Sequence, residues 1–514
     1  MNLSKSPLLL SAFSGVLLGI ASITLNEWLI WIALVPLIVA INGKGYKDTA
    51  RYAILCGFVF GGILLFWMPQ ALKVYSGTSL ILGYTGVILL SLLLSFWFAA
   101  MFLLYHTLNI KDANGVSYVI LNMLLFAAIF FITEFLRIHL LTGLVWTKFF
   151  LAAPLSANIY MIQLASVVGA IGIGLLVAAV NYLVACSIML KKKLFLVIAA
   201  AIFFANLGYG MAAFHLANTD LHDAKIIGIV CENVEAETRW VESGDAIINT
   251  MLGLVNESAR HNPEILVWSE TALPWTYIDN DDILVAISGI IKTNNRSTQN
   301  IVGYLTDTED DSGYVYNSAY LIDADGSAIG RVDKRRLLTF FEEPLLRSYE
   351  STAIPMLTQS IYNNIKRGER SPILNTSLGK AWVMVCNESL LPFYVDSPKK
   401  TPDYLVNMSN DAWLENTQNI QHHFYLARLR AIEYRKDMII NSNRGMSGII
   451  SSRGEVVRLS QSDSPELIIG PIHPNTIRTL YARFPLAMPI FIFLIFCIII
   501  LISFTMSFKS QPTQ

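Results

Sequence analysis

The sequence is poor in charged residues and in cysteine. Only 15% of its 514 residues are charged, whereas 54% are hydrophobic. A soluble domain typically carries about 25% charged residues, so we expect part of this chain to lie in lipid. The formal net charge of −1 gives no reason to expect a nucleic-acid partner. Five cysteines are too few for a disulfide scaffold, and no cluster of His, Cys and carboxylate residues has the spacing of a metal site. We expect no metal and no cofactor.

What the chain does have is long apolar runs. A helix needs about 20 apolar residues to cross the hydrocarbon of a bilayer. Seven runs before the middle of the chain and one at its end predict a polytopic α-helical membrane domain of about eight spans. The predicted spans cover approximately residues 7–25, 27–42, 52–72, 79–105, 118–137, 158–187, 194–215 and 485–506.

The distribution of Lys and Arg in the short loops predicts the orientation, because cytoplasmic loops carry an excess of basic residues. With the N-terminus in the cytoplasm, Lys44, Lys47 and the triplet at 191–193 fall inside, and the outer loops hold only three basic residues. Residues 220–475 would then lie on the far side of the cytoplasmic membrane.

Residues 220–475 have a different pattern, in which short β-branched runs alternate with polar helical stretches. Runs such as EILVWSE, AWVMVCNES and DYLVNMSND are typical of buried strands. DADG at 323–326 and SSRG at 451–454 are typical of hairpin turns. We predict an α/β domain with two sheets covered by helices, placed between a membrane domain (1–219) and a C-terminal span with a short tail (476–514).

Local sequence context indicates two candidate catalytic residues, Glu270 and Lys334. Glu270 ends an apolar strand in ILVWSETALPW, where an α/β fold exposes side chains to a cleft; a surface carboxylate or helix cap is the alternative. Lys334 lies in a basic triplet, which is usually a solvated surface. Glu342 and Glu343 follow it, however, and an ammonium beside carboxylates stays charged.

Cys386, in VMVCNESLLPF, is either an inert cysteine at a strand end or a nucleophile. A free thiol has only a few per cent thiolate at neutral pH, so a nucleophilic cysteine needs a base and a cation. Glu270 and Lys334 would supply one of each. His422 and His423 lie in a predicted helix and are interpreted as structural, which argues against a Cys–His protease arrangement.

These residues resemble the Glu–Lys–Cys triad of the carbon–nitrogen hydrolase (nitrilase) superfamily. The stretch LVNMSNDAWLENTQNIQHHFYLARLRAIEYRKDMIINSNRG is similar to that family's N-x-S-N-D-A-W loop, A-R-x-R-A-x-E helix and N-x-G strand end. Seven spans before the domain and one after it resemble the apolipoprotein N-acyltransferase branch. Thr339 and Phe341 stand where the family usually has proline and glycine, and Asn387 where it often has an aromatic residue.

The resemblance implies an αββα nitrilase-like fold and acyl transfer by a ping-pong route. A membrane phospholipid would donate an acyl chain to Cys386 as a thioester, and the α-amine of a diacylglyceryl-cysteine on an apolipoprotein would accept it. Glu270 would be the general base, and Lys334 would stabilise the oxyanion. We expect a monomer in the bacterial inner membrane, with this domain on the periplasmic side and no nucleic-acid partner.

The resemblance also implies supporting roles. Glu342 would orient Lys334, and Glu388 would shape the pocket beside the cysteine. Trp240 and Asn317 match positions near the substrate cleft, with ordinary packing and a turn amide as the alternatives.

Other interpretations stay open. The apolar loop residues Leu337, Leu338, Phe340 and Phe341 either dip toward lipid or belong to the core. The same triad with water as acceptor would make a membrane-anchored amidase or nitrilase-type hydrolase. A divergent, non-catalytic lipid-binding paralogue is the third alternative.

Overall fold

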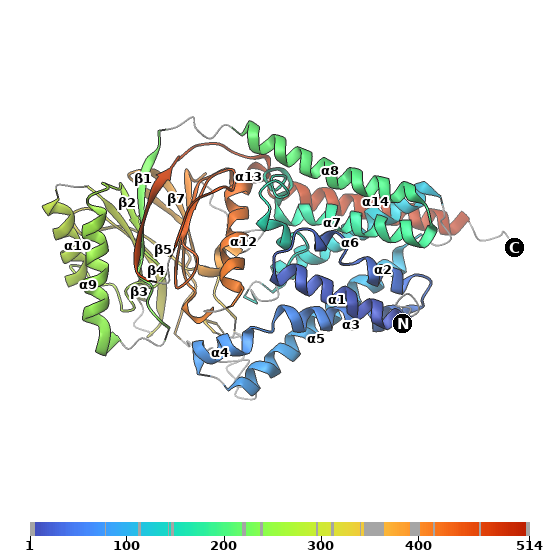
Figure 1. Ribbon diagram of the computed structural model, residues 1–514, viewed down its shortest axis with the longest axis horizontal. Helices are drawn as coiled ribbons and strands as arrows, with labels where there is room; N and C mark the ends of the chain where they lie inside the picture. The colour runs from blue at the N-terminus through green and yellow to red at the C-terminus, as the bar shows by residue number, and fades with distance from the viewer. Residues whose placement is uncertain are drawn as a thin grey trace.

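The structure has a helical part and a part built from two β-sheets, which follow each other along its longest axis (Figure 1). It is a computed structural model. It describes residues 6–77, 79–110, 115–141, 143–144, 149–217, 223–236, 240–294, 297–309, 313–339, 341–343, 364–390, 401–414, 417–461 and 464–509.

Apolar helices make up the helical part. They are α1 (Pro7–Ile23), α2 (Val35–Ile41), α3 (Tyr46–Leu64), α4 (Met68–Ser76), α5 (Leu80–Leu108), α6 (Val116–Leu140), α7 (Ala165–Leu190), α8 (Lys193–Leu216) and α14 (Ala487–Lys509), with the 3₁₀ segments η2 (Leu29–Trp31) and η4 (Ala153–Ala157). Among the described residues, α5, α6, α7 and α8 are long and apolar enough to cross a membrane. A fifth span results if α3 and α4, which are bent by 41°, count as one.

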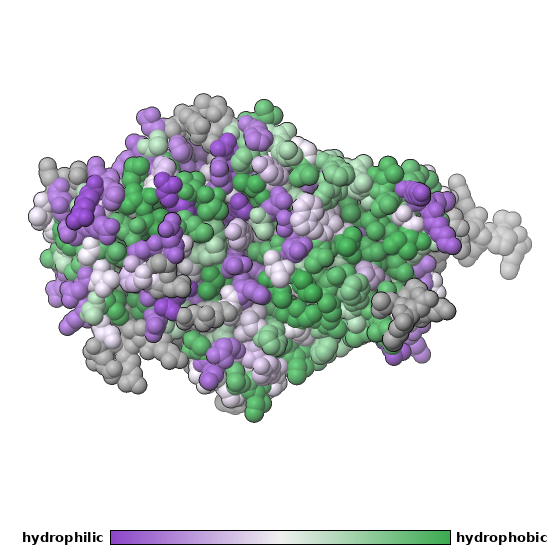
Figure 2. Space-filling view, viewed as in Figure 1, coloured by the Kyte–Doolittle hydropathy of each residue, from purple (hydrophilic) through white to green (hydrophobic). Residues whose placement is uncertain are grey.

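Three shorter apolar helical stretches complete the set, at Pro7–Ile23, Leu29–Ile41 and Ala487–Ser503. Every predicted span therefore coincides with apolar helix, but by length only four or five of the described helices qualify as membrane-crossing. Figure 2 shows the consequence on the visible surface, where hydrophobic residues dominate over the helices and hydrophilic residues are more frequent over the sheets.

The other part contains two six-stranded sheets. The first has the order β12-β1-β2-β3-β4-β5, with β1 (Lys225–Cys231), β2 (Ile265–Val267), β3 (Gln299–Asp307), β4 (Val315–Ile322), β5 (Ala328–Asp333) and β12 (Glu466–Ile472). The second has the order β11-β10-β9-β8-β7-β6, with β6 (Ile373–Thr376), β7 (Gly379–Val385), β8 (Tyr404–Asn410), β9 (Met438–Asn443), β10 (Gly448–Ile450) and β11 (Val456–Leu459).

The strands are apolar on both faces because each sheet is covered on both sides. Ile229 and Val406 belong to the core between the sheets. The outer face of the first sheet packs on α9 (Trp240–Ser258) and α10 (Asp282–Thr293). The outer face of the second packs on α12 (Asn419–Tyr434), whose core continues into the helical part. The layers therefore run helix, sheet, sheet, helix, as predicted, with α12 between the second sheet and the helices (Figure 1).

The strand directions bring the candidate residues to common edges. In the first sheet β2 and β3 are parallel, β4 is antiparallel to β3, and β5 is antiparallel to β4. Glu270 after β2 and Lys334 after β5 therefore lie at the same edge. In the second sheet β7 and β8 are parallel, so Cys386 lies at the same edge as Asn410.

A buried amide joins the two sheets. Asn441 on β9 is 0% exposed, and its Nδ2 donates hydrogen bonds to the carbonyl oxygens of Val230 at 2.7 Å and Val267 at 3.0 Å. Both acceptors lie in the first sheet, so this side chain ties the two sheets together in their core.

Replacing this amide should destabilise the sandwich. Asn441→Leu removes the hydrogen bonds to two buried carbonyls, and each lost hydrogen bond costs about 0.5–1.5 kcal/mol. We expect a clear fall in the unfolding temperature of the detergent-solubilised protein, measured by intrinsic fluorescence. Asn294→Leu is the control, because Asn294 is exposed and its side chain donates to the Ile290 carbonyl of the neighbouring helix α10 rather than across the sheets. Equal unfolding temperatures for the two variants would contradict the role of Asn441.

Candidate active site

Cys386 lies at a sharp turn at the end of β7. It begins the 3₁₀ segment η5 (Cys386–Leu390) and has a φ angle of 56°, which residues with a Cβ rarely adopt. Such a conformation persists only when the surroundings hold it. Here the Cys386 carbonyl accepts hydrogen bonds from Asn407 Nδ2 at 3.1 Å and Ser389 Oγ at 3.3 Å, and His423 Nε2 lies 3.2 Å away.

A buried ammonium stands between two carboxylates. Lys334 is 1% exposed, and its Nζ donates to Glu270 Oε1 at 2.9 Å and Glu342 Oε1 at 2.8 Å. Glu342 Oε2 accepts from the Leu338 backbone at 2.8 Å, which fixes this carboxylate to the loop after β5. The predicted contact between Lys334 and Glu342 is therefore present in the geometry.

Glu270 is surrounded by donors. Its Oε1 also accepts from Asn317 Nδ2 at 2.8 Å, and its Oε2 accepts from the Asn410 backbone N–H at 3.0 Å. Asn317 lies on β4, and its own Oδ1 has no hydrogen-bond partner among the described residues. The carboxylate of Glu270 is thus aligned by both sheets at once.

The charges in this cluster act on the thiol. Burial raises the pKa of Cys386 well above its ordinary value; the charge of Glu270 raises it further, and Lys334 opposes both. Burial works against the Lys334 ammonium, but a Cys386 thiolate, once formed, and the carboxylates of Glu270 and Glu342 outweigh it and raise the pKa of Lys334. The resting site therefore holds a neutral thiol beside a charged ammonium, and a thiolate requires a base.

Glu388 joins the loop of the lysine to the turn of the cysteine. Its Oε1 accepts from the backbone N–H groups of Arg335 at 2.8 Å and Arg336 at 3.1 Å, and its Oε2 accepts from Val385 at 2.8 Å. Arg335 follows Lys334 and Val385 precedes Cys386, so this carboxylate sets the position of one candidate residue relative to the other. It lies behind the cavity rather than in its wall.

The candidate residues line one cavity of about 600 Å³. Glu270, Asn317, Lys334, Glu342 and Cys386 all contribute to its wall. Val74 of α4 lines it too, so a helix of the helical part forms one side of the site.

Other predictions have mixed outcomes. Trp240 begins α9, but its side chain lies outside the described part of the chain. Leu337, Leu338 and Phe341 are buried at 1%, 3% and 6% exposure, which argues against the lipid-dipping interpretation. Leu338 lines the cavity that holds Cys386, and Phe340 lies outside the described residues.

The sequence predicted structural roles for Asp411, in the loop after a strand, and for His423, in a helix, but not that the two meet at Cys386. Asp411 Oδ1 lies 2.8 Å from His423 Nδ1, and the other ring nitrogen faces the Cys386 carbonyl. The only available signals were an aspartate directly after a strand and a histidine in an otherwise ordinary helix. Nothing in their spacing indicates that they meet at the cysteine.

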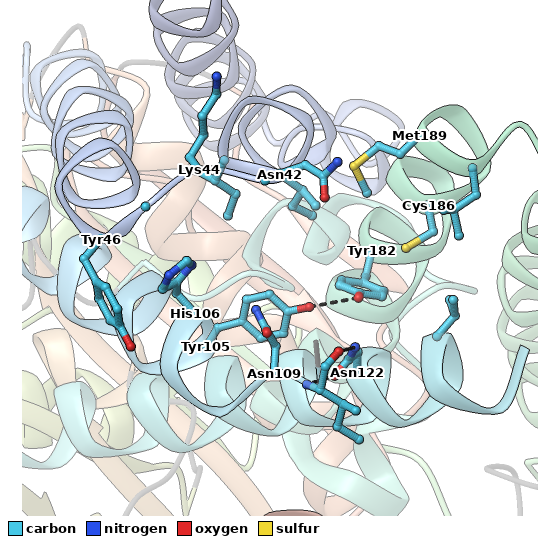
Figure 3. Close-up of a pocket in the computed structure, with 17 residues that line it drawn as sticks. Asn42, Lys44, Tyr46, Tyr105, His106, Asn109, Asn122, Tyr182, Cys186 and Met189 are labelled. Carbon is cyan, nitrogen blue, oxygen red and sulfur yellow. Dashed lines mark hydrogen bonds between the residues drawn. The ribbon is translucent and has the colours of Figure 1, made fainter. Parts of the chain in front are cut away.

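A larger cavity, of about 820 Å³, lies among the helices α2, α5, α6 and α7 (Figure 3). The hydroxyl of Tyr105 donates to that of Tyr182 at 2.8 Å, and Lys44 and His106 contribute basic groups. No carboxylate is found among the described residues of its wall, so it lacks the base that the other cavity has. In the described parts of the chain, no group of three or more His, Cys, Asp and Glu residues could hold a metal ion.

Two family models match this chain, one over each of its parts. The family model described as carbon–nitrogen hydrolase matches residues 234–482, and the one described as apolipoprotein N-acyltransferase N-terminal domain matches residues 14–183. Among solved structures, a Saccharomyces cerevisiae protein described as a member of branch 10 of the nitrilase superfamily is 12% identical, covers 51% of this chain and 94% of its own, and has a TM-score of 0.36.

Curated relatives bear the same description. An apolipoprotein N-acyltransferase of Rhizobium meliloti (strain 1021) is 30% identical over 64% of this chain and 63% of that protein, just under two thirds of its length. One of Geobacter metallireducens is 24% identical over 93% of this chain and 91% of that protein. The two-sheet part is thus a carbon–nitrogen hydrolase domain. Together the two family models match most of the chain, and both the helical part and the two-sheet part are similar to apolipoprotein N-acyltransferases.

Removing the ammonium should make the thiol harder to ionise. Because Lys334 lowers the pKa of Cys386, Lys334→Met should raise that pKa. We expect iodoacetamide to label Cys386 more slowly at a given pH, with the half-maximal rate at higher pH, as measured by peptide mass spectrometry.

The matched control is Lys225→Met. The Lys225 side chain is 41% exposed and pairs at the surface with Glu264. Its loss should leave the pH profile unchanged. A profile for Lys334→Met that moves to lower pH, with the variant folded, would contradict the assigned electrostatics.

Proposed function

We propose that this protein transfers an acyl chain from a membrane phospholipid to the α-amine of the diacylglyceryl-cysteine of an apolipoprotein. The observation that carries the proposal is the cavity in which Glu270, Lys334 and Cys386 meet beside Val74 of α4. A base, a cation and a thiol in one cavity suit covalent acyl transfer. The helical residue in the wall and the similarity to apolipoprotein N-acyltransferases favour a lipid substrate over a water-soluble amide.

In the first half-reaction, Glu270 takes the thiol proton and the Cys386 sulfur attacks the ester carbonyl of the phospholipid. Lys334 Nζ stabilises the tetrahedral oxyanion, together with backbone N–H groups beside the cysteine. Donors of this kind contribute about 2.7–4 kcal/mol each. The proton on Glu270 then passes to the departing lysophospholipid oxygen, the carbon–oxygen bond breaks, and a thioester remains.

In the second half-reaction, the α-amine attacks the thioester carbonyl. Glu270 takes a proton from the amine nitrogen, and the carbon–sulfur bond breaks as the amide forms. The Cys386 sulfur leaves and recovers the proton from Glu270, which restores the starting state. Asn317, which lines the cavity and has no partner for its Oδ1 among the described residues, would accept a second N–H of the amine.

We propose eight membrane spans, made up of the five candidates that count α3 and α4 as one and the three shorter apolar stretches. The membrane domain would cover residues 1–219 and the catalytic domain 220–475, with a last span and tail in 476–514. The basic loops support an N-terminus in the cytoplasm and a catalytic domain on the periplasmic side of the inner membrane. A site beside the helices lets acyl chains stay in apolar surroundings, since exposing each CH₂ to water costs about 0.8 kcal/mol.

The proposal predicts an acyl-enzyme. Purified protein incubated with phospholipid and no acceptor should gain the mass of one acyl chain at Cys386, and hydroxylamine should remove it. Cys386→Ala should abolish the adduct, whereas Cys497→Ala, at an exposed cysteine of α14, should not. Glu270→Gln should slow its formation by about 10²–10⁴-fold, the usual contribution of a general base. Glu257→Gln, on the exposed face of α9, is its control.

Adding a diacylglyceryl lipopeptide then separates transferase from hydrolase. The adduct should pass to the peptide nitrogen, giving an N-acyl product detectable by mass spectrometry. Release of free fatty acid with no N-acyl product would favour the hydrolase alternative. Absence of any adduct on folded, lipid-bound protein would overturn the proposed chemistry.

A further inference from the structure

His423 makes two contacts that a neutral imidazole cannot satisfy together. Its Nδ1 lies 2.8 Å from Asp411 Oδ1 and 3.0 Å from Asp411 Oδ2, and its Nε2 lies 3.2 Å from the carbonyl oxygen of Cys386. A carboxylate and a backbone carbonyl both accept hydrogen bonds, and a neutral imidazole carries only one N–H. Both nitrogens must therefore be protonated for both contacts to be favourable.

We infer that Asp411 and His423 form a positioning pair that holds the turn at Cys386 through the imidazolium ring. The inference rests on the proposed function, because it concerns the thiol that would carry the acyl chain. The pair touches the backbone of the cysteine rather than its sulfur, so it acts by orienting the thiol.

The Cys386 carbonyl needs such a donor. It belongs to a residue with a φ of 56°, and its other donors are Asn407 of β8 and Ser389 of η5. His423 adds a donor from a third element, α12, and is the only one of the three that can carry charge. With three elements holding this oxygen, the Sγ side of the turn stays directed to the cavity.

Asp411 is itself held rigidly. It follows β8, is 1% exposed, and its backbone N–H donates to the Asn443 carbonyl at 2.9 Å. Gly445 leaves it room, since a Cβ there would lie 2.7 Å from Asp411 Oδ2. These contacts hold the Asp411 carboxylate in place beside the His423 ring.

The environment of the ring favours its charged form. Burial alone would lower the pKa of His423, but Asp411, the Cys386 carbonyl and the more distant Glu270 outweigh it and raise that pKa above its ordinary value. On the side of the helical part, Ser22, Leu25, Leu64 and Trp67 line the small cavity next to the ring and bring no charge. On α12 itself, the adjacent His422 points to the Ile23 carbonyl at 3.1 Å.

The proposed pair makes the rate of Cys386 acylation depend on pH. When folding raises the pKa of a group, the protonated group stabilises the folded state at low pH. This stabilisation is lost as the pH rises through the folded-state pKa. When His423 loses a proton, Nδ1–H keeps its bond to the Asp411 carboxylate, and Nε2 stops donating to Cys386. The rate of Cys386 acylation should therefore fall at alkaline pH for a reason separate from the thiol, whose own ionisation favours the reaction as pH rises.

The test compares the rate of thioester formation with phospholipid from pH 6 to 10 in full-length protein. His423→Leu removes the donor and should slow acylation roughly tenfold to hundredfold, the range of a hydrogen bond to a charged group. His423→Gln keeps an uncharged donor, so it should retain much more of the rate and lack the alkaline fall. Asp411→Asn should move the fall to lower pH by about one to three units, the effect of losing an adjacent opposite charge.

His422→Gln is the matched control, because it alters the neighbouring histidine without touching Cys386, and it should keep both the rate and the alkaline fall. If His423→Gln shows the same alkaline fall as the wild type, or if His423→Leu acylates at the wild-type rate, the inference is wrong. If His423→Leu does not fold, as judged by its unfolding temperature, the pH profile of His423→Gln alone tests the inference.

A second readout does not depend on the proposed reaction. Labelling of Cys386 by iodoacetamide should show the same order of variants, because it reports only the accessibility and ionisation of the thiol. If the wild type forms no thioester, the proposed function fails. The labelling order then decides the role of the pair independently, and labelling of His423→Leu at the wild-type rate across the pH range would overturn it.

Discussion

The site depends on one buried ammonium that is shared by two carboxylates. Lys334 Nζ lies 2.9 Å from Glu270 and 2.8 Å from Glu342, and all three side chains are almost completely buried. Removing one partner of a buried ion pair typically costs about 3–5 kcal/mol, because the other charge stays in the interior unpaired. The cluster therefore ties the loop after β2 to the loop after β5, across the two strands that separate them in the sheet. Backbone donors to Glu342 and Glu270 add further hydrogen bonds that hold the two carboxylates in place.

The same charge balance explains why the thiol can stay unreactive until it is needed. Two carboxylates and one ammonium leave a net negative charge beside Cys386, which together with burial raises its pKa. A thiolate then forms only as its proton moves to Glu270 and negative charge moves on to the substrate oxygen near Lys334. Reaction with the ester is thus coupled to proton transfer, whereas a permanently ionised cysteine would also be open to oxidation.

Local sequence patterns predicted strand ends, turns and contacts within one loop, because neighbouring residues determine these features. Strand ends located Glu270 and Cys386, and the DADG and SSRG turns form at glycines with φ of 92° at Gly326 and 83° at Gly454. The spacing of Lys334 and Glu342 was a usable signal because both lie in one loop. Asp411, His423 and Cys386 come from three different elements, and no periodicity encodes their meeting. The burial of Leu338 could not be predicted from the sequence either, because an apolar loop residue is compatible both with a position facing lipid and with one facing a cavity.

Helix α12 connects the apolar helices of the helical part to the candidate active site. One of its sides packs on the second sheet and presents His423 to Cys386, and the other contacts the helical part through polar groups. Glu433 Oε1 accepts from the Ala170 backbone at 2.7 Å, and Arg428 Nη1 donates to the Ser156 carbonyl at 3.3 Å. Charged groups buried at such an interface fix its geometry, because any shift leaves them without partners. The two-sheet part separated from the helices would expose these groups and lose one support of α12. The position of the nucleophile therefore depends on helices that contribute no proposed catalytic group, which gives a physical reason for building both parts into one chain.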